Sequence, residues 1–223
     1  MGEIMRPVPF EELIVRIFSE YRLQQSIFSI HEDQFYKVNP QKGIKVFDQF
    51  CATPLGPAAG PHTQLAQNIV SSYLVGGRFM ELKTVQKLDT LEVEKPCIDV
   101  RDEGYNVEWS TEYTLEKAHD EYVKAYIILH LLDALFNNGE FTSPSFIFNM
   151  SIGYDLAGIK TPKMQQYIDS MIDAKKSPVF DSYIASLKAI IEEQTFLEDT
   201  KWAHLYKKLT SLPKKISHNI CPS

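Results

Sequence analysis

Two short runs decide the fold: Ala52-Thr53-Pro54-Leu55-Gly56-Pro57-Ala58-Ala59-Gly60 and Phe79-Met80-Glu81-Leu82-Lys83-Thr84-Val85-Gln86. Between them, residues 64–74 place apolar groups at helical spacing, and Gly76-Gly77 is typical of the end of a helix. The order strand, helix, strand predicts a βα unit whose second strand lies parallel to the first. Sheets of parallel strands bind ligands at the carboxyl ends of the strands, so the ends of both runs form the candidate site.

The residues at these two ends have suitable sizes and charges for a flat ligand. Ala58, Ala59 and Gly60 have little or no side chain, so a planar ring can lie against their backbone. Lys83 ends an otherwise apolar run and could meet negative charge on a bound ring, and the hydroxyl of Thr84 follows it. A plainer interpretation makes the first run a tight turn and Lys83 a solvated lysine. The ligand site requires both runs to end at the same face of neighbouring strands.

Several of these runs resemble flavin enzymes. Leu82-Lys83-Thr84-Val85 resembles the second-strand motif of dihydropyrimidine dehydrogenases and dihydroorotate dehydrogenases, which are FMN enzymes on a TIM barrel, and Ala58-Ala59-Gly60 resembles their flavin platform. Residues 106–112 resemble the segment whose Asn reaches flavin and substrate, and residues 146–154 resemble their third strand. The run Cys51 to Asn68 is similar to the N-terminal part of the selenate reductase flavoprotein subunit family, and this similarity covers the whole chain.

The resemblance implies an oxidoreductase whose cofactor is FMN. Lys83 would stabilise negative charge near N1 of the reduced flavin, and Thr84 and Asn106 would reach the ring or the substrate. Asn149 or Ser151, at the end of the third strand, would line the same pocket, although Asn149 also fits a capped strand end. The resemblance assigns no catalytic residue and no metal ligand here, and the implied cofactor-binding residues are Ala58, Ala59, Gly60, Lys83, Thr84, Asn106 and Asn149.

Composition narrows the classes of partner and compartment. The net charge of −6 makes a general nucleic-acid surface improbable, and no apolar run approaches the ~20 residues that a membrane helix needs. The first residues lack a signal-peptide pattern, and Cys51, Cys97 and Cys221 are scattered thiols that suit a reducing compartment. We therefore expect a cytoplasmic protein. The sequence contains no C-x-x-C, so iron–sulfur clusters and an FAD or NAD(P) module would belong to other parts of such a reductase.

Hydrophobic spacing predicts the remaining elements. We expect helices near residues 10–21 and 111–138, a short strand at 44–47 that could be one arm of a hairpin, and a buried strand at 145–151. His130 should be a packed residue of the long helix. After Tyr154 the pattern is helical over 161–212 and predicts no further strand, which leaves Cys221 as a thiol in a flexible tail. The expected domains are residues 1–160, the N-terminal part of an FMN-type β/α barrel, and residues 161–223, a helical insertion and tail.

The expected fold class is α/β, with partial TIM-barrel-like βα units, an N-terminal helix and a helical C-terminal segment. A closed barrel takes about eight strands and ~250 residues, so the chain is either a small open sheet or, as we expect, the first part of a longer barrel. Without the later strands that hold the FMN phosphate, the chain alone should bind FMN weakly or not at all and be inactive.

Its expected partners are the remainder of the reductase polypeptide or its redox subunits, with self-association through unpaired apolar surface. The alternative function is a non-catalytic α/β module that binds a protein partner at an exposed barrel edge.

Overall fold

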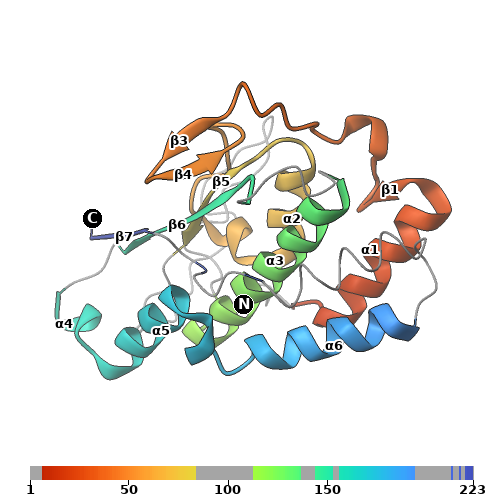
Figure 1. Ribbon diagram of the computed structural model, residues 1–223. Coiled ribbons are helices and arrows are strands. Elements are labelled where there is room, and N and C mark those ends of the chain that lie inside the picture. The colour runs from red at the N-terminus through yellow and green to blue at the C-terminus, as the bar shows by residue number, and fades with distance from the viewer. Residues whose placement is uncertain are drawn as a thin grey trace, which may run out of the picture.

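A computed structural model describes residues 7–83, 113–136, 144–152, 156–193, 212, 216 and 219–222 (Figure 1). The elements, in chain order, are α1 (Phe10–Gln24), β1 (Ser26–Ile27), β2 (Ile30–His31), η1 (Glu32–Gln34), β3 (Ile44–Val46), β4 (Gln49–Cys51), η2 (Pro61–Gln64), α2 (Ala66–Leu74), β5 (Phe79–Lys83), α3 (Leu115–Phe136), β6 (Ile147–Ile152), α4 (Leu156–Ile159), α5 (Pro162–Ile172), η3 (Ala174–Lys176), α6 (Phe180–Glu193) and β7 (Asn219–Pro222).

A parallel sheet with the order β5-β6-β7 is the centre of the fold. Lys83 of β5 pairs in register with Ser151 of β6, and Asn149 of β6 pairs with Asn219 of β7. The prediction of a buried strand near 145–151 is confirmed by β6, whose Phe148 and Met150 are 1% and 0% exposed. Such burial fits a strand with neighbours on both sides and helices against one face.

The strand β7 corrects the expectation that no strand follows Tyr154. Asn219 to Pro222 lies parallel to β6, with Cys221 in register with Ser151, so Cys221 belongs to a strand and not to a flexible tail. The sequence signal was weak because the run has four residues, one of them a proline, and little apolar alternation. Its pairing depends on hydrogen bonds to β6, which is distant in the sequence.

The expected first strand is replaced by two structures. Residues 44–46 and 49–51 form the antiparallel hairpin β3–β4, which confirms the hairpin arm expected at 44–47. Residues 55–57 then run beside β5 in the same direction, since Leu55 O accepts from Phe79 N at 3.0 Å and Pro57 O from Glu81 N at 3.3 Å. Prolines supply no backbone N–H, so this segment accepts hydrogen bonds from β5 without completing a regular ladder.

Gly56 permits this close approach. A Cβ atom placed on Gly56 would lie 1.6 Å from the carbonyl oxygen of Phe79, so any side chain there would force the segment away from β5. The run Pro54-Leu55-Gly56-Pro57 is therefore neither a regular strand nor a simple turn. It is an irregular edge held against β5, and it delivers Ala58 to Gly60 to the carboxyl-terminal half of that strand.

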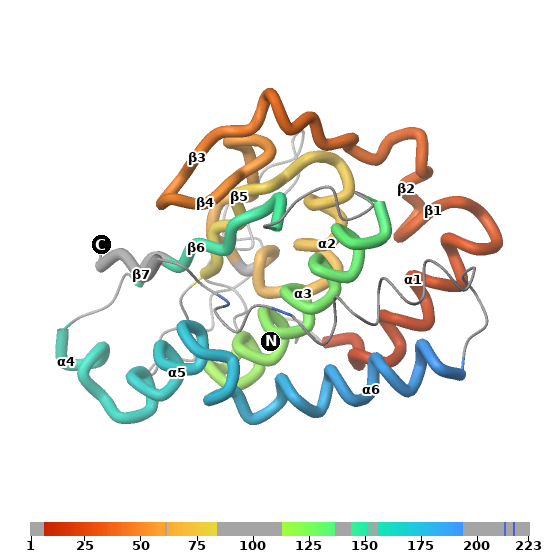
Figure 2. Tube along the Cα trace, viewed as in Figure 1, coloured from red at the N-terminus to blue at the C-terminus, as the bar shows by residue number. Residues whose placement is uncertain are grey.

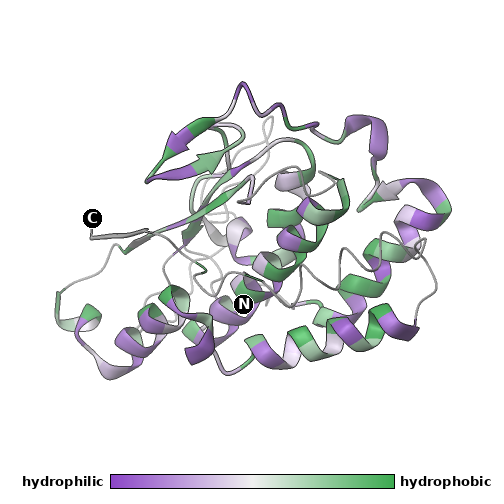
Figure 3. Ribbon diagram, in the orientation of Figure 1, coloured by the Kyte–Doolittle hydropathy of each residue, from purple (hydrophilic) through white to green (hydrophobic). Residues whose placement is uncertain are grey.

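Helices cover the apolar face of the sheet and enclose α3 (Figure 1). Along α3 nearly every side chain is buried, because the helix contacts α2 on one side and α5 and α6 on another. The helices expected near 10–21, 64–74 and 111–138 are confirmed as α1, α2 and α3, and His130 is packed in α3 at 1% exposure. In Figure 3, hydrophilic and hydrophobic residues alternate along α1 and α6, as amphipathic surface helices require.

The N-terminal helix α1 packs against α6 in the helical layer. The tube in Figure 2 brings α1 beside α6, and the rings of Phe10 and Tyr183 are 4.5 Å apart. Met164, Met171 and Leu187 from α5 and α6 join the same hydrophobic core as residues of α1 and α3. The helices expected within 161–191 are confirmed by α5 and α6, while the one expected near 202–209 lies outside the described residues. The division into residues 1–160 and 161–223 stays a prediction.

Candidate functional site

The sheet has a polar face formed by alternate residues of β5 and β6. Glu81, Lys83 and Asn149 are half-buried, whereas the residues between them point into the apolar core. Glu81 is the register partner of Asn149, and Lys83 follows on the same face of β5. Neighbouring strands lie about 4.8 Å apart, so these three side chains share a small area. The structure therefore brings together Lys83 and Asn149, which the sequence had placed in one site.

Asn149 presents a polar atom that suits a ligand. Its Oδ1 is buried and accepts no hydrogen bond from the described residues. Buried acceptors in folded proteins are nearly always paired, so an orphaned one on a polar face is a position where a ligand donor fits. Capping of the strand end through Nδ2 would also leave this atom unpaired, so both interpretations of Asn149 stay predictions.

The segment of small residues is tied to the same polar face. Ala59 N donates to Glu81 Oε2 at 3.2 Å, while Ala58 is exposed and Ala59 half-buried. Gly60 N donates to Thr63 Oγ1 at 3.1 Å, and that hydroxyl donates back to Gly60 O at 2.8 Å, which closes the turn into η2. The first run and the described part of the second run, up to Lys83, thus meet beside one face. Glu81 was missed by the sequence analysis, although its position two residues before Lys83 on an alternating strand could have indicated it.

Charged residues of α3 support the loops at this edge. Glu121 is fully buried, and its Oε2 accepts from Ala66 N at 2.9 Å, at the start of α2. Its Oε1 pairs with Lys124 Nζ at 2.8 Å, and Lys124 also pairs with Asp120 at 3.0 Å. Burial raises the pKa of the Glu121 carboxyl. Burial opposes the charge on Lys124, but Glu121 and Asp120 together raise its pKa.

One hydrogen bond links α3 directly to the end of β5. The phenol of Tyr122 donates to Lys83 O at 2.7 Å, from a side chain that is 0% exposed. This bond holds the backbone of Lys83 at the point where its side chain leaves the polar face. The helical spacing of apolar residues over 111–138 includes Tyr122, but such spacing does not identify which strand residue the hydroxyl reaches, so this contact was not predicted.

Two predicted site residues, Thr84 and Asn106, lie outside the described residues, and their assignments stay predictions. Ser151 is placed by backbone register beside Lys83. Within the described part of the chain, no group of three or more His, Cys, Asp or Glu side chains is arranged to hold a metal ion. Among the same residues, no helix has the length and apolar character needed to cross a membrane.

Comparison with known proteins identifies the family. Residues 28–223 match the family described as "Oxidoreductase YgfK, N-terminal TIM-barrel domain". The chain is 57% identical over 216 residues to the protein named "Putative oxidoreductase YgfK" of Escherichia coli (strain K12), and equally to that of Escherichia coli O157:H7. The match covers 97% of this chain and 21% of each relative, so the chain spans about a fifth of their length. No solved structure matches.

The described fold agrees with this family. Its parallel strands β5, β6 and β7 and their helical covering form an open arrangement, as expected of part of a β/α barrel. The match also places the chain with the N-terminal part of an oxidoreductase, as the resemblance implied. The chain belongs to the family of N-terminal TIM-barrel domains of YgfK oxidoreductases.

Proposed function

We propose that this chain forms the first-strand half of an FMN site in an iron–sulfur-linked oxidoreductase related to selenate reductase flavoprotein subunits and dihydropyrimidine dehydrogenases. The observation that carries the proposal is the polar face. Lys83 and Asn149 lie on the adjacent strands β5 and β6. On the same face, the backbone N–H of Ala59 donates a hydrogen bond to Glu81, the register partner of Asn149. A flat, partly anionic ring needs an open backbone platform, a cation and hydrogen-bonding groups on one surface, and these residues provide all three.

In this proposal, each residue of the polar face has a separate role in binding the ring. Ala58 to Gly60 leave room for its flat side, and Asn149 Oδ1 can accept a hydrogen bond from a ring N–H. Lys83 places a positive charge where reduction of the ring adds a negative one. Bound FMN would supply the electron and hydride transfer that amino-acid side chains cannot.

The rest of the polypeptide completes the site in this proposal. The chain covers 21% of the length of its curated relatives, so the FMN phosphate site, the iron–sulfur clusters and an FAD or NAD(P) module are assigned to the remainder. The isolated chain should accordingly bind FMN weakly. Submicromolar binding of FMN by this chain alone would contradict this division of the site.

The test replaces Lys83 with Met in the full-length oxidoreductase. A partly buried contact between opposite charges contributes on the order of 1–3 kcal/mol, and ~30 mV corresponds to ~1.4 kcal/mol for a two-electron couple. Lys83→Met should lower the flavin potential by some tens of millivolts and change FMN occupancy little. The matched control is Lys45→Met, because Lys45 is exposed on the β3–β4 hairpin in an ion pair with Asp48. Equal flavin potentials in the two variants would show that Lys83 does not contact the flavin.

A second candidate function is supported by exposed apolar groups at the irregular edge. Phe47 is 48% exposed and Leu55 70% exposed, on segments that precede β5. Both residues lie beside Phe79, since the rings of Phe47 and Phe79 are 6.3 Å apart and Leu55 O accepts from Phe79 N. Exposed apolar groups that lie together are typical of surfaces that other protein segments cover. In this alternative the chain is a non-catalytic interaction module for the remaining polypeptide. Full-length protein purified without flavin absorbance, and unable to take up added FMN, would favour it.

A further inference from the structure

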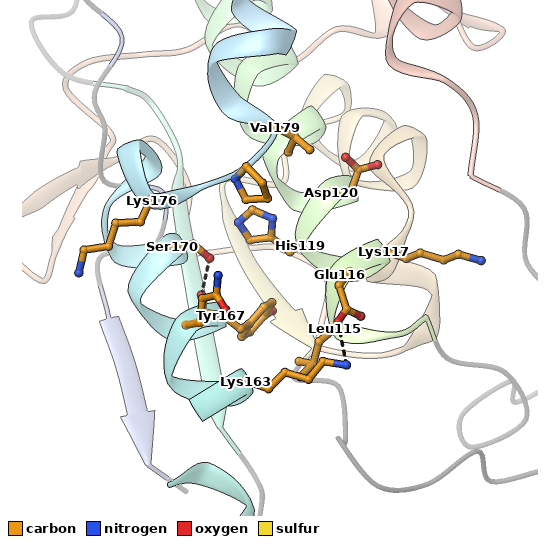
Figure 4. A pocket seen from close by; sticks show the side chains of 12 residues that line it. Leu115, Glu116, Lys117, His119, Asp120, Lys163, Tyr167, Ser170, Lys176 and Val179 are labelled. Atoms are coloured by element: carbon orange, nitrogen blue, oxygen red, sulfur yellow. Dashed lines mark hydrogen bonds and ion pairs between the residues drawn. The ribbon is translucent and has the colours of Figure 1, made fainter. Parts of the chain in front are cut away.

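A cleft of about 360 Å³ opens between the start of α3 and the elements α5 and η3 (Figure 4). Most of its surface is apolar or aromatic, from Leu115 and His119 of α3, Tyr167 of α5, and Pro178 and Val179 before α6. The other seven lining residues, among them Glu116, Lys117 and Asp120, are polar or charged. A volume of this size falls within the range of small-molecule sites, which are mostly apolar with a few polar groups. Glu81, Lys83 and Asn149 do not line it, so the cleft is separate from the polar face of the sheet.

Two buried polar atoms belong to the residues of this wall. His119 and Tyr167 are each 5% exposed, yet His119 Nε2 and Tyr167 Oη have no hydrogen-bond partner among the residues that the structure describes. Their ring centroids are 6.1 Å apart with the planes at 72°, so the rings meet edge to face and do not satisfy each other's polar atoms. Figure 4 shows both rings between α3 and α5 at the cleft. Burial lowers the pKa of His119 to about 4, so its imidazole is neutral near neutrality and can donate or accept.

Most charges around the cleft are paired; the exception among the described lining residues is Lys117, whose side chain extends away from the cleft in Figure 4. Lys163 binds Glu116 at 2.7 Å, and Lys176 binds Asp169 at 3.0 Å. Asp120 accepts from the phenol of Tyr183 at 2.5 Å and also pairs with a lysine of its own helix. A charged ligand would have to compete with these pairs, whereas an uncharged one has two unsatisfied polar atoms to reach, both enclosed by the residues of the wall.

We propose that the cleft binds a small, uncharged aromatic molecule whose edge carries both a hydrogen-bond donor and an acceptor, as a primary or cyclic amide does. The ring packs against Leu115, Val179 and the ring of Tyr167, and the amide-like edge pairs with His119 Nε2 and Tyr167 Oη. Sites that pair buried polar groups in this way discriminate strongly against molecules that lack the matching group, because those groups are then left unpaired.

The experiment measures binding of three ring compounds to the 223-residue chain by ligand-observed NMR, and protein-observed NMR follows the imidazole signal of His119. Benzamide has the neutral donor and acceptor, benzoate has a charge, and toluene has no polar group. Benzamide should bind at least several-fold more tightly than either, and it should shift the imidazole signal of His119. One hydrogen bond contributes roughly a two- to tenfold difference in affinity, so Tyr167→Phe should weaken benzamide by that factor and leave toluene unchanged.

The matched control is Tyr36→Phe, since Tyr36 lies against Arg78 and Gly76 and does not line the cleft. It should leave benzamide affinity as in the wild type. A second variant, Val179→Trp, adds bulk to the wall and keeps both polar groups, so it should abolish binding of all three compounds. Circular dichroism identifies the folded variants. If Tyr167→Phe fails to fold, the proposal is tested by the affinity of Val179→Trp and by the His119 signal of the wild type.

Three results would overturn the proposal. Benzamide could fail to bind or to shift the His119 signal, benzoate or toluene could bind as tightly as benzamide, or Val179→Trp could retain full affinity. Flavin binding at the polar face does not enter any of these measurements, so the proposed FMN site can fail or succeed independently.

Discussion

Acid should destabilise the folded chain through His119. This imidazole is 5% exposed, and burial lowers its pKa from 6.5 to about 4, while the charge of Asp120 opposes the shift in part. Between these two values the unfolded chain binds a proton at this residue and the folded chain does not. Stability from His119 is therefore present above pH 6.5 and is lost as the pH falls toward 4.

The magnitude follows from the two pKa values. At 1.36 kcal/mol per pKa unit, the difference between the two pKa values of His119 corresponds to a loss of roughly 3 kcal/mol in the free energy of unfolding. The loss between about pH 7 and about pH 5 is roughly 2 kcal/mol. Urea denaturation at these two pH values, followed by far-ultraviolet circular dichroism, measures the loss. Other groups titrate in the same range, and burial of Glu121 acts in the opposite direction because its pKa is raised. The comparison must therefore be made with a variant.

His119→Gln removes the titrating group and keeps a polar side chain of similar length. Between about pH 7 and about pH 5 the free energy of unfolding should decrease in both proteins. The decrease should be about 2 kcal/mol smaller in the His119→Gln variant than in the wild type. The control is His31→Gln, because the side chain of His31 is 53% exposed and pairs with the exposed Asp33. Identical pH dependence in the wild type and His119→Gln would show that the buried imidazole is not protonated on unfolding, and would refute the reasoning.

Two further predictions concern stability and are measured by the same denaturation assay. Glu121→Gln should cost about 2–4 kcal/mol, because it leaves the 3% exposed Lys124 with one fewer buried countercharge. Glu116→Gln, on an exposed ion pair, should cost at most about 1 kcal/mol, and equal losses in the two variants would contradict this account. Gly56→Ala should cost roughly 1–3 kcal/mol, because its Cβ would lie 1.6 Å from Phe79 O. A wild-type midpoint for Gly56→Ala would show that residues 55–57 are not held against β5.

The candidate site was partly predictable from local pattern. Alternation along β5 places Lys83 at a strand end, and the small residues Ala58 to Gly60 indicate a place for close backbone approach. The orphaned oxygen of Asn149 and the bond from Ala59 to Glu81 were not predictable, because each depends on a partner many residues away. Periodicity states which side of a strand a residue occupies, but it does not state what faces that side.

The burial of charged residues in α3 could not be predicted from the sequence, for a related reason. The spacing of apolar residues predicted a helix, which α3 confirms. Glu121 and Lys124 are not among those apolar residues, and charged residues of a helix are expected to meet solvent. Both are buried because other helices and the start of α2 cover that side as well. Their charges persist there through mutual pairing and the amide of Ala66.

The sequence by itself determined the helices α1, α2, α3, α5 and α6, the buried strand β6 and the hairpin arm β3, because the signals of each element lie within a few residues of one another. Tertiary structure decided the remaining features: the pairing of β7 with β6, the irregular edge at 55–57, and the cleft beside His119 and Tyr167. Each of these depends on hydrogen bonds or packing between segments far apart in the chain. A four-residue strand containing a proline acquires its structure from the neighbour that it pairs with, and a cleft exists only where two helices are held apart by everything else that packs against them.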